Sequence, residues 1–389
     1  MISTRYNLGY SFLLLLNTCI LFFSANNFSI SFKEVNIYFE ATHKLLYYIT
    51  HFSTAIFGQN DIALRLPFIL FYILSVILLH LLTRDYFKKP IDRFISSSIF
   101  MFLPGVYSAA LLVNEAIIVI FATLLYLYLK KITQKEQYIL LILYLFIDNS
   151  FAILYLALFV YSLKQKDNKL LVFSLVLFGI SMSIYGFDIQ GHPRGYFLDT
   201  FGIYASIFSP ILFLYFFYVI YRVGIKYDKD IYWYISATAL CFSFILSFRQ
   251  KINIEDFAPF VVISVPVMVK VFMHSLRIRL KIYRKKYYFI AFLSIFFLSL
   301  NILLFIFNKY LYIFLDNPKK HFAYKYYIAK ELAVKLHNLH INSVYLPDNK
   351  LQKRLKFYNI DKIKLSSTKL NNKIIIKYYD KAIQQIVFY

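Results

Sequence analysis

The chain contains a series of apolar runs, each about long enough to cross a lipid bilayer as a helix. A transmembrane helix needs about 20 mainly apolar residues, with roughly 17–25 as the usual range. Hydrophobic residues make up 60% of the 389 positions and charged residues 16%, against roughly 25% charged in a soluble domain. So few polar side chains cannot cover a water-exposed surface. The pattern predicts an all-α polytopic membrane protein, with spans at residues 8–23, 62–82, 170–185, 201–221, 231–248, 259–274 and 288–307.

Two further apolar stretches contain breaks. Residues 94–129 are too many for one span and are interrupted at Pro104-Gly105 and Asn114-Glu115, so we expect two helices joined near Asn114. Residues 138–163 fit one helix that places Asp148 near the bilayer centre, which is costly. They also fit a hairpin of two short helices that turns at Asp148-Asn149.

The positive-inside rule decides in favour of the hairpin. With the hairpin, the cytoplasmic loops 164–169, 222–230 and 275–287 carry twelve Lys and Arg, and the outer loops 186–200 and 249–258 carry three. A single helix would reverse this imbalance. The prediction is therefore about eleven spans, with the N-terminus in the cytoplasm and the C-terminus outside. Ser24-Ala25-Asn26 is a poor cleavage site, so we expect the first span to be an uncleaved signal anchor.

The composition changes after residue 307, which predicts a boundary between a membrane domain (1–307) and an extracytoplasmic domain (308–389). Four apolar residues at helical spacing indicate a helix there: Ile328, Leu332, Leu336 and Leu339. Strands are expected at 343–347, 362–365 and 373–377, and a helix at 349–358. The prediction is a small α/β domain on the outer leaflet. The alternative role is a basic cap that stabilises the membrane domain and contacts phosphate headgroups.

The chain carries 43 Lys and Arg against 20 Asp and Glu, and the location of this excess argues against a nucleic-acid partner. About 20 of the basic residues flank spans, where they set topology and attract anionic membrane lipids. Another 16 lie in residues 308–389, on the predicted outer side. Cys19 and Cys241 both lie in apolar runs, which makes a disulfide framework unlikely to form.

Most of the carboxylates that do not resemble part of a solvated surface lie in the predicted outer loops and at the ends of spans. Polar groups at the membrane interface are candidates for function. These nine residues come from different loops, as the ligands of one outward-facing site would: Glu34, Glu40, Asp61, Glu115, Asp148, Asp188, Asp199, Glu255 and Asp256.

The first outer loop carries the most informative motif. It contains Phe32-Lys33-Glu34-Val35-Asn36, then an aromatic amphipathic stretch, and it ends in the phrase FGQNDIALRLP at 57–67. This pattern resembles the C-type glycosyltransferases, in the family 39-like group of protein O-mannosyltransferases and the lipid A aminoarabinose transferase. Members of that group have one span, an outer loop with an acidic pair, a juxtamembrane helix and a phrase like FG-x-x-x-x-A-L-R-L-P. The resemblance is specific over residues 30–130 and architectural beyond them.

The resemblance implies transfer of a sugar from a polyprenyl-phosphate donor to a lipid, glycan or protein acceptor on the outer face, with inversion at the anomeric carbon. In that chemistry a carboxylate deprotonates the acceptor and cations hold the phosphate leaving group. The family usually has Asp-Glu in the first loop, where this chain has Lys33-Glu34. The presence of Lys33 where the family usually has Asp bears directly on whether the site is active.

Each candidate site residue has a functional and a structural interpretation. Glu34 is the candidate general base, or an interfacial carboxylate paired with Lys33 or Lys44. The functional interpretation of Glu115 is that it orients the acceptor or binds a divalent cation together with Glu34. The structural interpretation is that its negative charge only stabilises the N-terminus of a helix. No cofactor is required by the sequence.

The candidate cations also have two interpretations. Arg194, in a turn-rich loop, suits a bidentate grip on the donor phosphate, or it anchors to headgroups. Arg249 and Lys251 are candidates for the same phosphate, with Glu255 and Asp256 as acidic residues that neutralise them. Arg65 is expected to support the site by pairing with an outer carboxylate such as Asp61.

Two other classes of protein compete with the enzyme. A catalytically degenerate relative would act as a lipid-binding, glycan-binding or assembly subunit, which the Lys33 departure favours. A transporter or flippase would have ionisable residues at mid-membrane and broken helices in repeated halves, and neither is evident. The expected location is a bacterial inner membrane, with the C-terminal domain in the periplasm.

Overall fold

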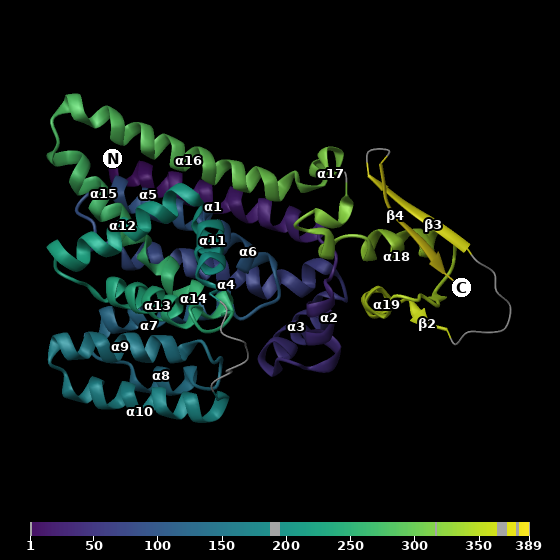
Figure 1. Ribbon diagram of the computed structural model, residues 1–389, viewed down its shortest axis with the longest axis horizontal. Helices are drawn as coiled ribbons and strands as arrows, with labels where there is room; N and C mark the ends of the chain where they lie inside the picture. The colour runs from purple at the N-terminus through teal and green to yellow at the C-terminus, as the bar shows by residue number, and fades with distance from the viewer. Residues whose placement is uncertain (1, 187–194, 316, 364–371, 379–380, 389) are drawn as a thin grey trace. The chain divides into compact units, whose positions relative to one another are not determined.

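The computed structural model describes residues 2–186, 195–315, 317–363, 372–378 and 381–388. Over these residues the chain is mainly α-helical, with four short strands near the C-terminus (Figure 1). It divides into two compact units. Unit 1 comprises Met1–Thr18, Leu70–Ala110 and Asn114–Ile302, and unit 2 comprises Cys19–Ile69, Leu111–Val113 and Leu303–Tyr389.

Three long helices contribute residues to both units: α1 (Ile2–Asn27), α4 (Asp61–Leu82) and α16 (Arg284–Ile306). Unit 1 otherwise consists of α5 (Pro90–Phe102), α6 (Pro104–Leu111), α7 (Ala116–Thr133), α8 (Tyr138–Tyr144), α9 (Phe151–Gln165), α10 (Asn168–Tyr185), α11 (Phe197–Phe208), α12 (Pro210–Lys226), α13 (Ile231–Ser247), α14 (Ile254–Val261), η1 (Val262–Ser264), α15 (Val265–Ile278) and η2 (Lys281–Tyr283).

The predicted fold class, an all-α polytopic membrane protein, is confirmed. Six helical segments among the described residues are long and apolar enough to cross a membrane: Arg5–Asn27, Asp61–Leu82, Ala116–Thr133, Asn168–Tyr185, Ile254–Ile278 and Lys281–Ile306. The number rises to eight if each of two bent helix pairs is one span. Phe151–Gln165 and Ile231–Ser247 are apolar but shorter. The count of eleven spans and the sides of the termini stay predictions.

The helix breaks follow the chemistry of individual residues. The hairpin within 138–163 is present, because α8 ends at Tyr144 and α9 begins at Phe151. Asp148 holds the turn between them: its Oδ2 accepts a hydrogen bond from the backbone N–H of Ser150 at 3.2 Å. A short polar side chain that bonds nearby backbone in this way competes with helix and favours a turn.

Two expectations about breaks are wrong. The run 201–221 is not one helix: α11 and α12 meet at Ser209-Pro210 with a bend of 107°. Proline lacks the backbone N–H that would continue the helix and is favoured at a helix start. The segment 94–129 breaks at Leu103-Pro104, with a bend of 53°, as well as after Leu111, so it forms three helices and not two.

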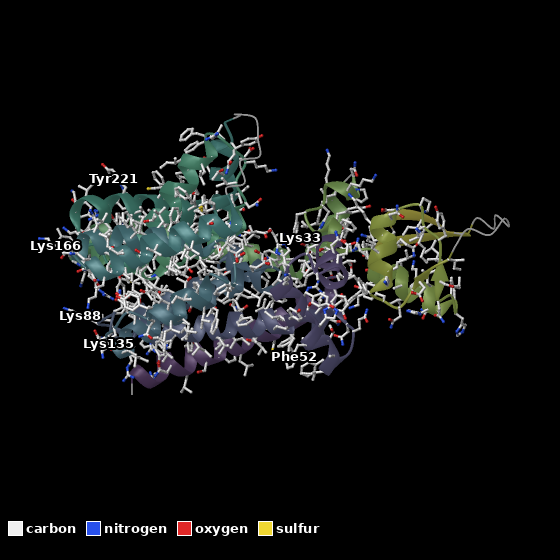
Figure 2. All side chains as sticks on the ribbon, turned by 90° about the horizontal axis from the view of Figure 1, so that it is seen from below. Lys33, Phe52, Lys88, Lys135, Lys166 and Tyr221 are labelled. Carbon is white, nitrogen blue, oxygen red and sulfur yellow. The ribbon has the colours of Figure 1, made fainter. Side chains whose placement is uncertain are left out.

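Basic residues of three different loops lie at the same end of unit 1. Figure 2 shows Lys88, Lys135 and Lys166 together at this end. A shared face of loop lysines is what the positive-inside rule requires of a cytoplasmic side.

An ion pair joins two helices of unit 1. Arg277 on α15 forms a bidentate ion pair with the buried Asp92 of α5.

Helix packing in unit 1 leaves no room for a side chain at Gly105. A Cβ placed there would lie 2.5 Å from Cγ2 of Ile207 on α11, closer than real Cβ contacts come. The absence of a side chain at Gly105 therefore allows α6 and α11 to approach each other.

We expect Gly105→Ala to destabilise unit 1 by ~1–3 kcal/mol, the usual cost of overpacking a core. The measurement is the thermal unfolding midpoint of the purified protein in detergent. Gly179→Ala on α10 is the matched control, because a Cβ there meets nothing within 4 Å. Equal midpoints for the two variants would contradict the packing argument.

Unit 2 contains residues 24–61, which the sequence predicts to be the first outer loop, and the C-terminal segment. Besides its shares of the long helices, it consists of α2 (Phe32–Glu40), α3 (Lys44–Phe57), η3 (Asn308–Tyr310), α17 (Leu311–Phe314), η4 (Pro318–Lys320), η5 (Tyr324–Tyr326), α18 (Ala329–Asn338), β1 (Ser343–Val344), α19 (Asn349–Lys356), β2 (Asp361–Lys362), β3 (Asn372–Tyr378) and β4 (Lys381–Phe388). The predicted domain boundary after residue 307 stays a prediction.

The strands of unit 2 form two small sheets. β1 and β2 are parallel, with Ser343 opposite Asp361. β3 and β4 form an antiparallel hairpin beside α18, with a register shift between Ile376 and Lys377 (Figure 1). The two expected helices are present as α18 and α19. The strand at 343–347 is limited to two residues, and β4 was not expected. Half of the strand expected at 362–365 lies outside the described residues.

His321 is buried in unit 2, and its ring nitrogens have opposite roles. Nδ1 accepts a hydrogen bond from the backbone N–H of Ala323 at 3.1 Å, and Nε2 donates to the carbonyl oxygen of Asn308 at 2.9 Å. The ring stacks on Tyr312 with 4.1 Å between centroids. Burial lowers the pKa of His321 below its ordinary value. The fold therefore accommodates the neutral imidazole.

We expect unit 2 to lose stability as the pH falls from 7 to 5. The unfolded chain takes up a proton on His321 at about pH 6.5, whereas the folded chain does so only at lower pH, so protonation favours unfolding. The measurement is the unfolding midpoint as a function of pH. The fall should be smaller in His321→Asn, and an equal fall in both proteins would exclude His321 as its source.

Candidate functional site

The side chain of Arg65 lies at the centre of a polar cluster in unit 2. Arg65 is on α4, one turn after its start, and is fully buried. Its guanidinium donates to five backbone carbonyl oxygens: Leu111 (2.8 Å), Phe28 (2.9 Å), Ser29 (3.2 Å), Ala25 (3.3 Å) and Asp61 (3.3 Å). It also contacts two carboxylates, at 3.4 Å from Glu34 and 3.6 Å from Asp61. The pair with Asp61 is the one expected from the sequence.

Glu34 is buried at the start of α2, where it forms a capping box with Ser31. The Ser31 hydroxyl accepts from the backbone N–H of Glu34 at 3.3 Å, and Oε2 of Glu34 accepts from the backbone N–H of Ser31 at 2.7 Å. Ser followed three residues later by Glu is the sequence signature of this motif. The spacing was visible in the sequence and was not used, although it identifies a structural role for Glu34.

Glu34 and Arg65 together hold the backbone of residues 111–113. Oε1 of Glu34 accepts from the backbone N–H of Val113 at 3.2 Å, and Nε of Arg65 donates to the carbonyl oxygen of Leu111. Residues 111–113 are thus held at one end by Arg65 and at the other by Glu34, which form a buried ion pair with each other. This segment leads directly into Asn114-Glu115, the second outer acidic position.

Asp61 connects this cluster to the C-terminal segment. Its carboxylate accepts a hydrogen bond from the hydroxyl of Tyr358 at 2.7 Å and pairs with Nζ of Lys330 at 3.0 Å. Burial, and next the charge of Asp61, raises the pKa of Tyr358 well above its ordinary value. Tyr358 therefore acts as a hydrogen-bond donor here.

Arg354, on α19, binds the first outer loop a second time. It donates to the carbonyl oxygens of Ile30 and Tyr327, both at 2.7 Å, and to the hydroxyl of Ser29 at 2.9 Å. Burial lowers the pKa of Arg354 below its ordinary value. Sequence reasoning missed Arg354, Lys330 and Tyr358, since their partners lie about 300 residues away and no local pattern indicates them.

The structure brings together three of the predicted site residues, namely Glu34, Asp61 and Arg65. Lys33 is exposed on α2, next to Glu34 in the chain. Glu115, at the N-terminus of α7, belongs to unit 1. Arg249 and Lys251 also belong to unit 1, where both are exposed between α13 and α14. Arg194 lies outside the described residues.

The expectation of a divalent cation finds no ready ligand set. In the described part of the chain, no three His, Cys, Asp or Glu side chains gather as a metal site requires. Both oxygens of Glu34 accept from N–H groups, which are the wrong partners for a metal ligand.

A cavity of about 490 Å³ borders the cluster within unit 2. Its wall includes Asp61, Lys330, His337 and Tyr358, whereas Glu34 is not part of it. Cavities of this size accommodate small molecules. Of the carboxylates in the cluster, Asp61 is the one that borders this space.

A known protein family matches the segment that contains Asp61 and Arg65 of this cluster. Residues 44–153 match the model of the dolichyl-phosphate-mannose-protein mannosyltransferase family. The resemblance to the C-type glycosyltransferases is confirmed. The matched segment contains Asp61, Arg65 and Glu115, together with the phrase at 57–67 that indicated the resemblance.

One solved structure similar to this chain is the crystal structure of ArnT from Cupriavidus metallidurans in the apo state, with 12% sequence identity and a TM-score of 0.48. The match covers 72% of this chain and 62% of that chain, so it spans less than two thirds of ArnT. Among curated proteins, none matches the chain.

We expect Arg65→Leu to destabilise unit 2 by ~3–5 kcal/mol, because Glu34 and Asp61 would stay buried without their cation. Arg65→Lys should restore only part of the loss, since one ammonium group cannot reach all the acceptors of a guanidinium. The measurement is the rate of limited proteolysis within residues 28–60 of the detergent-purified protein. Lys44→Ala, which removes an exposed cation from α3, is the control and should leave that rate unchanged.

Proposed function

We propose that this protein is a membrane glycosyltransferase. It moves a sugar from a polyprenyl-phosphate donor to a lipid, glycan or protein acceptor on the extracytoplasmic face, in a bacterial inner membrane. The family match over residues 44–153 supports the class of reaction. The donor type, the acceptor and the location follow from the resemblance and are part of the proposal.

The observation that carries the proposal is the burial of Arg65 between Glu34 and Asp61. A charged group buried away from water is costly, so a fully buried arginine is a candidate for function. Asp61 and Arg65 lie at the start of an apolar helix and inside the matched segment, whereas Glu34 precedes that segment. The contacts of this cluster define the backbone that leads to Glu115.

The proposed reaction is a displacement at the anomeric carbon of the donor. A carboxylate takes the proton of the acceptor hydroxyl, whose oxygen forms the new bond to the anomeric carbon. The bond from that carbon to the phosphate oxygen breaks on the opposite side, which inverts the configuration. Cations stabilise the charge on the departing polyprenyl phosphate, and the candidates for this role are Arg194, Arg249 and Lys251.

Glu34 and Glu115 stay the proposed carboxylates of the reaction, and the geometry distinguishes them. Glu34 accepts three hydrogen bonds from Ser31, Arg65 and Val113, so both of its carboxylate oxygens are already engaged by the protein. A carboxylate held in this way is suited to positioning its neighbours. Glu115 is half-buried at a helix start beside the segment that Glu34 holds. We therefore assign proton transfer to Glu115 and positioning to Glu34.

The second candidate is a relative that retains the fold and binds lipid or glycan without transfer. The exposed Lys33, where the family usually has Asp, favours it. In this case the buried cluster serves only to hold unit 2 together. The transfer assay below separates this candidate from the enzyme.

The test uses membranes that contain the protein and a panel of labelled polyprenyl-phosphate sugars. We expect Glu115→Gln to reduce transfer by ~10²–10⁴-fold, the usual contribution of a general base, with an unchanged unfolding midpoint. Glu34→Gln should lower both the activity and the midpoint, because it weakens the contacts to Arg65.

Glu40→Gln is the matched control, since Glu40 is a partly exposed carboxylate that pairs with Lys353. It should retain wild-type transfer. Loss of transfer in Glu34→Gln with an unchanged midpoint would return the role of base to Glu34. Absence of transfer with every donor in the wild type, followed by gain of transfer in Lys33→Asp, would establish the degenerate relative.

A further inference from the structure

A second cavity in unit 2, of about 600 Å³, lies along α18. Its wall includes Ser29, Lys309, Tyr327, Lys330, Lys335 and Tyr378, and it does not include Glu34, Asp61 or Arg65. We propose that this cavity binds an anion, namely a phosphate group carried by a lipid headgroup or by a soluble phosphate ester. The proposal does not depend on the transfer reaction.

The charge of the cavity wall is the first argument. Three lysines line the cavity, against one carboxylate, Glu331, among its described lining residues. Lys309 pairs with Glu331 at 3.0 Å, and Lys330 pairs with Asp61 outside the wall, also at 3.0 Å. Lys335 donates to the neutral carbonyl oxygen of Ile375 at 2.8 Å. The wall therefore carries positive charge that its own carboxylate does not neutralise.

A buried hydroxyl is the second and independent argument. Tyr378 on β3 is 8% exposed, and its hydroxyl lies near the Glu331 carboxylate without a well-aligned hydrogen bond to it or to another described residue. Buried polar groups are nearly always paired, so an exception needs an explanation. Burial, and next the nearby Glu331, raises the pKa of Tyr378, which keeps the phenol protonated. A protonated phenol at the cavity wall is a donor that an anion oxygen satisfies.

The neighbourhood of Arg354 adds to the positive potential. Its guanidinium donates to the hydroxyl of Ser29 and the carbonyl oxygen of Tyr327, and both residues line the cavity. Neither acceptor carries charge, and the carboxylates that favour the charged form of Arg354 are Glu34, Asp348 and Asp61, none of which lines this cavity. A bound anion would add to their stabilisation of the buried cation.

A cationic ligand fits the cavity less well than an anion. The rings of Tyr327 and Tyr378 would suit an ammonium group, but Lys309 already lies over both, at 5.6 and 5.1 Å from the centroids. A second cation would be repelled by Lys309. The volume exceeds that of one phosphate ion, so the phosphate is expected to be part of a larger polar molecule such as a headgroup.

The test titrates inorganic phosphate into the full-length protein in detergent by calorimetry, at constant ionic strength set with chloride. We expect saturable binding that weakens about tenfold in Lys335→Ala and about tenfold in Tyr378→Phe, because each removes one hydrogen bond to a charged group. Lys319→Ala is the matched control, since Lys319 is exposed in the same unit and lines neither cavity. It should bind phosphate as the wild type does.

Three results would overturn the proposal: no saturable phosphate binding, wild-type affinity in both site variants, or an equal loss of affinity in Lys319→Ala. Tyr378→Phe removes only one oxygen atom, so we expect its unfolding midpoint to match that of the wild type. A loss of phosphate affinity in this variant would then not be due to misfolding. Binding is measured without any donor sugar, so its failure is distinct from failure of the transfer assay.

A second arm identifies the source of the phosphate. The titration is repeated in nanodiscs of phosphatidylcholine and of phosphatidylglycerol. If the natural ligand is an anionic headgroup, phosphatidylglycerol should compete and weaken phosphate binding at least tenfold. Equal affinity in the two lipids supports a soluble phosphate ester, provided that the two site variants still bind more weakly than the wild type.

Discussion

The fold of unit 2 depends on the buried guanidinium of Arg65. This one side chain donates hydrogen bonds to carbonyl oxygens at the end of α1 and to that of Leu111. It also forms ion pairs with the carboxylates of Glu34 and Asp61. A fully buried cation is stable only when nearly all its donors are used. The first outer loop therefore has little freedom to take another path, because each alternative leaves part of the guanidinium unpaired.

The C-terminal segment completes the same network from the other end of the chain. Arg354 donates to Ser29 and Ile30 of the first outer loop, and Lys330 and Tyr358 both bind Asp61. The two parts of the chain form one compact unit. In this unit the C-terminal segment does more than cap the loop, because it supplies one wall of each cavity.

Much of the helical architecture could be predicted from local chemistry. Apolar length identified the spans, and Asp148 and Asn149 correctly indicated the turn between α8 and α9. The break at Pro210 was also encoded in the chain, but it was missed because most of the residues around it are apolar. Hydropathy measures the length of an apolar run and is insensitive to one missing backbone donor within it.

The sequence by itself determined the membrane class, most helices and the family resemblance, because these depend on composition and on short phrases such as the one at 57–67. Only the tertiary structure decided which distant groups Glu34 contacts. Its partners Arg65 and Val113 are 31 and 79 residues away, and the pairing of a carboxylate over such separations follows from folding. The same reason explains why Arg354 and Tyr378 emerged only from the fold: their surroundings are made by segments that are distant in the chain.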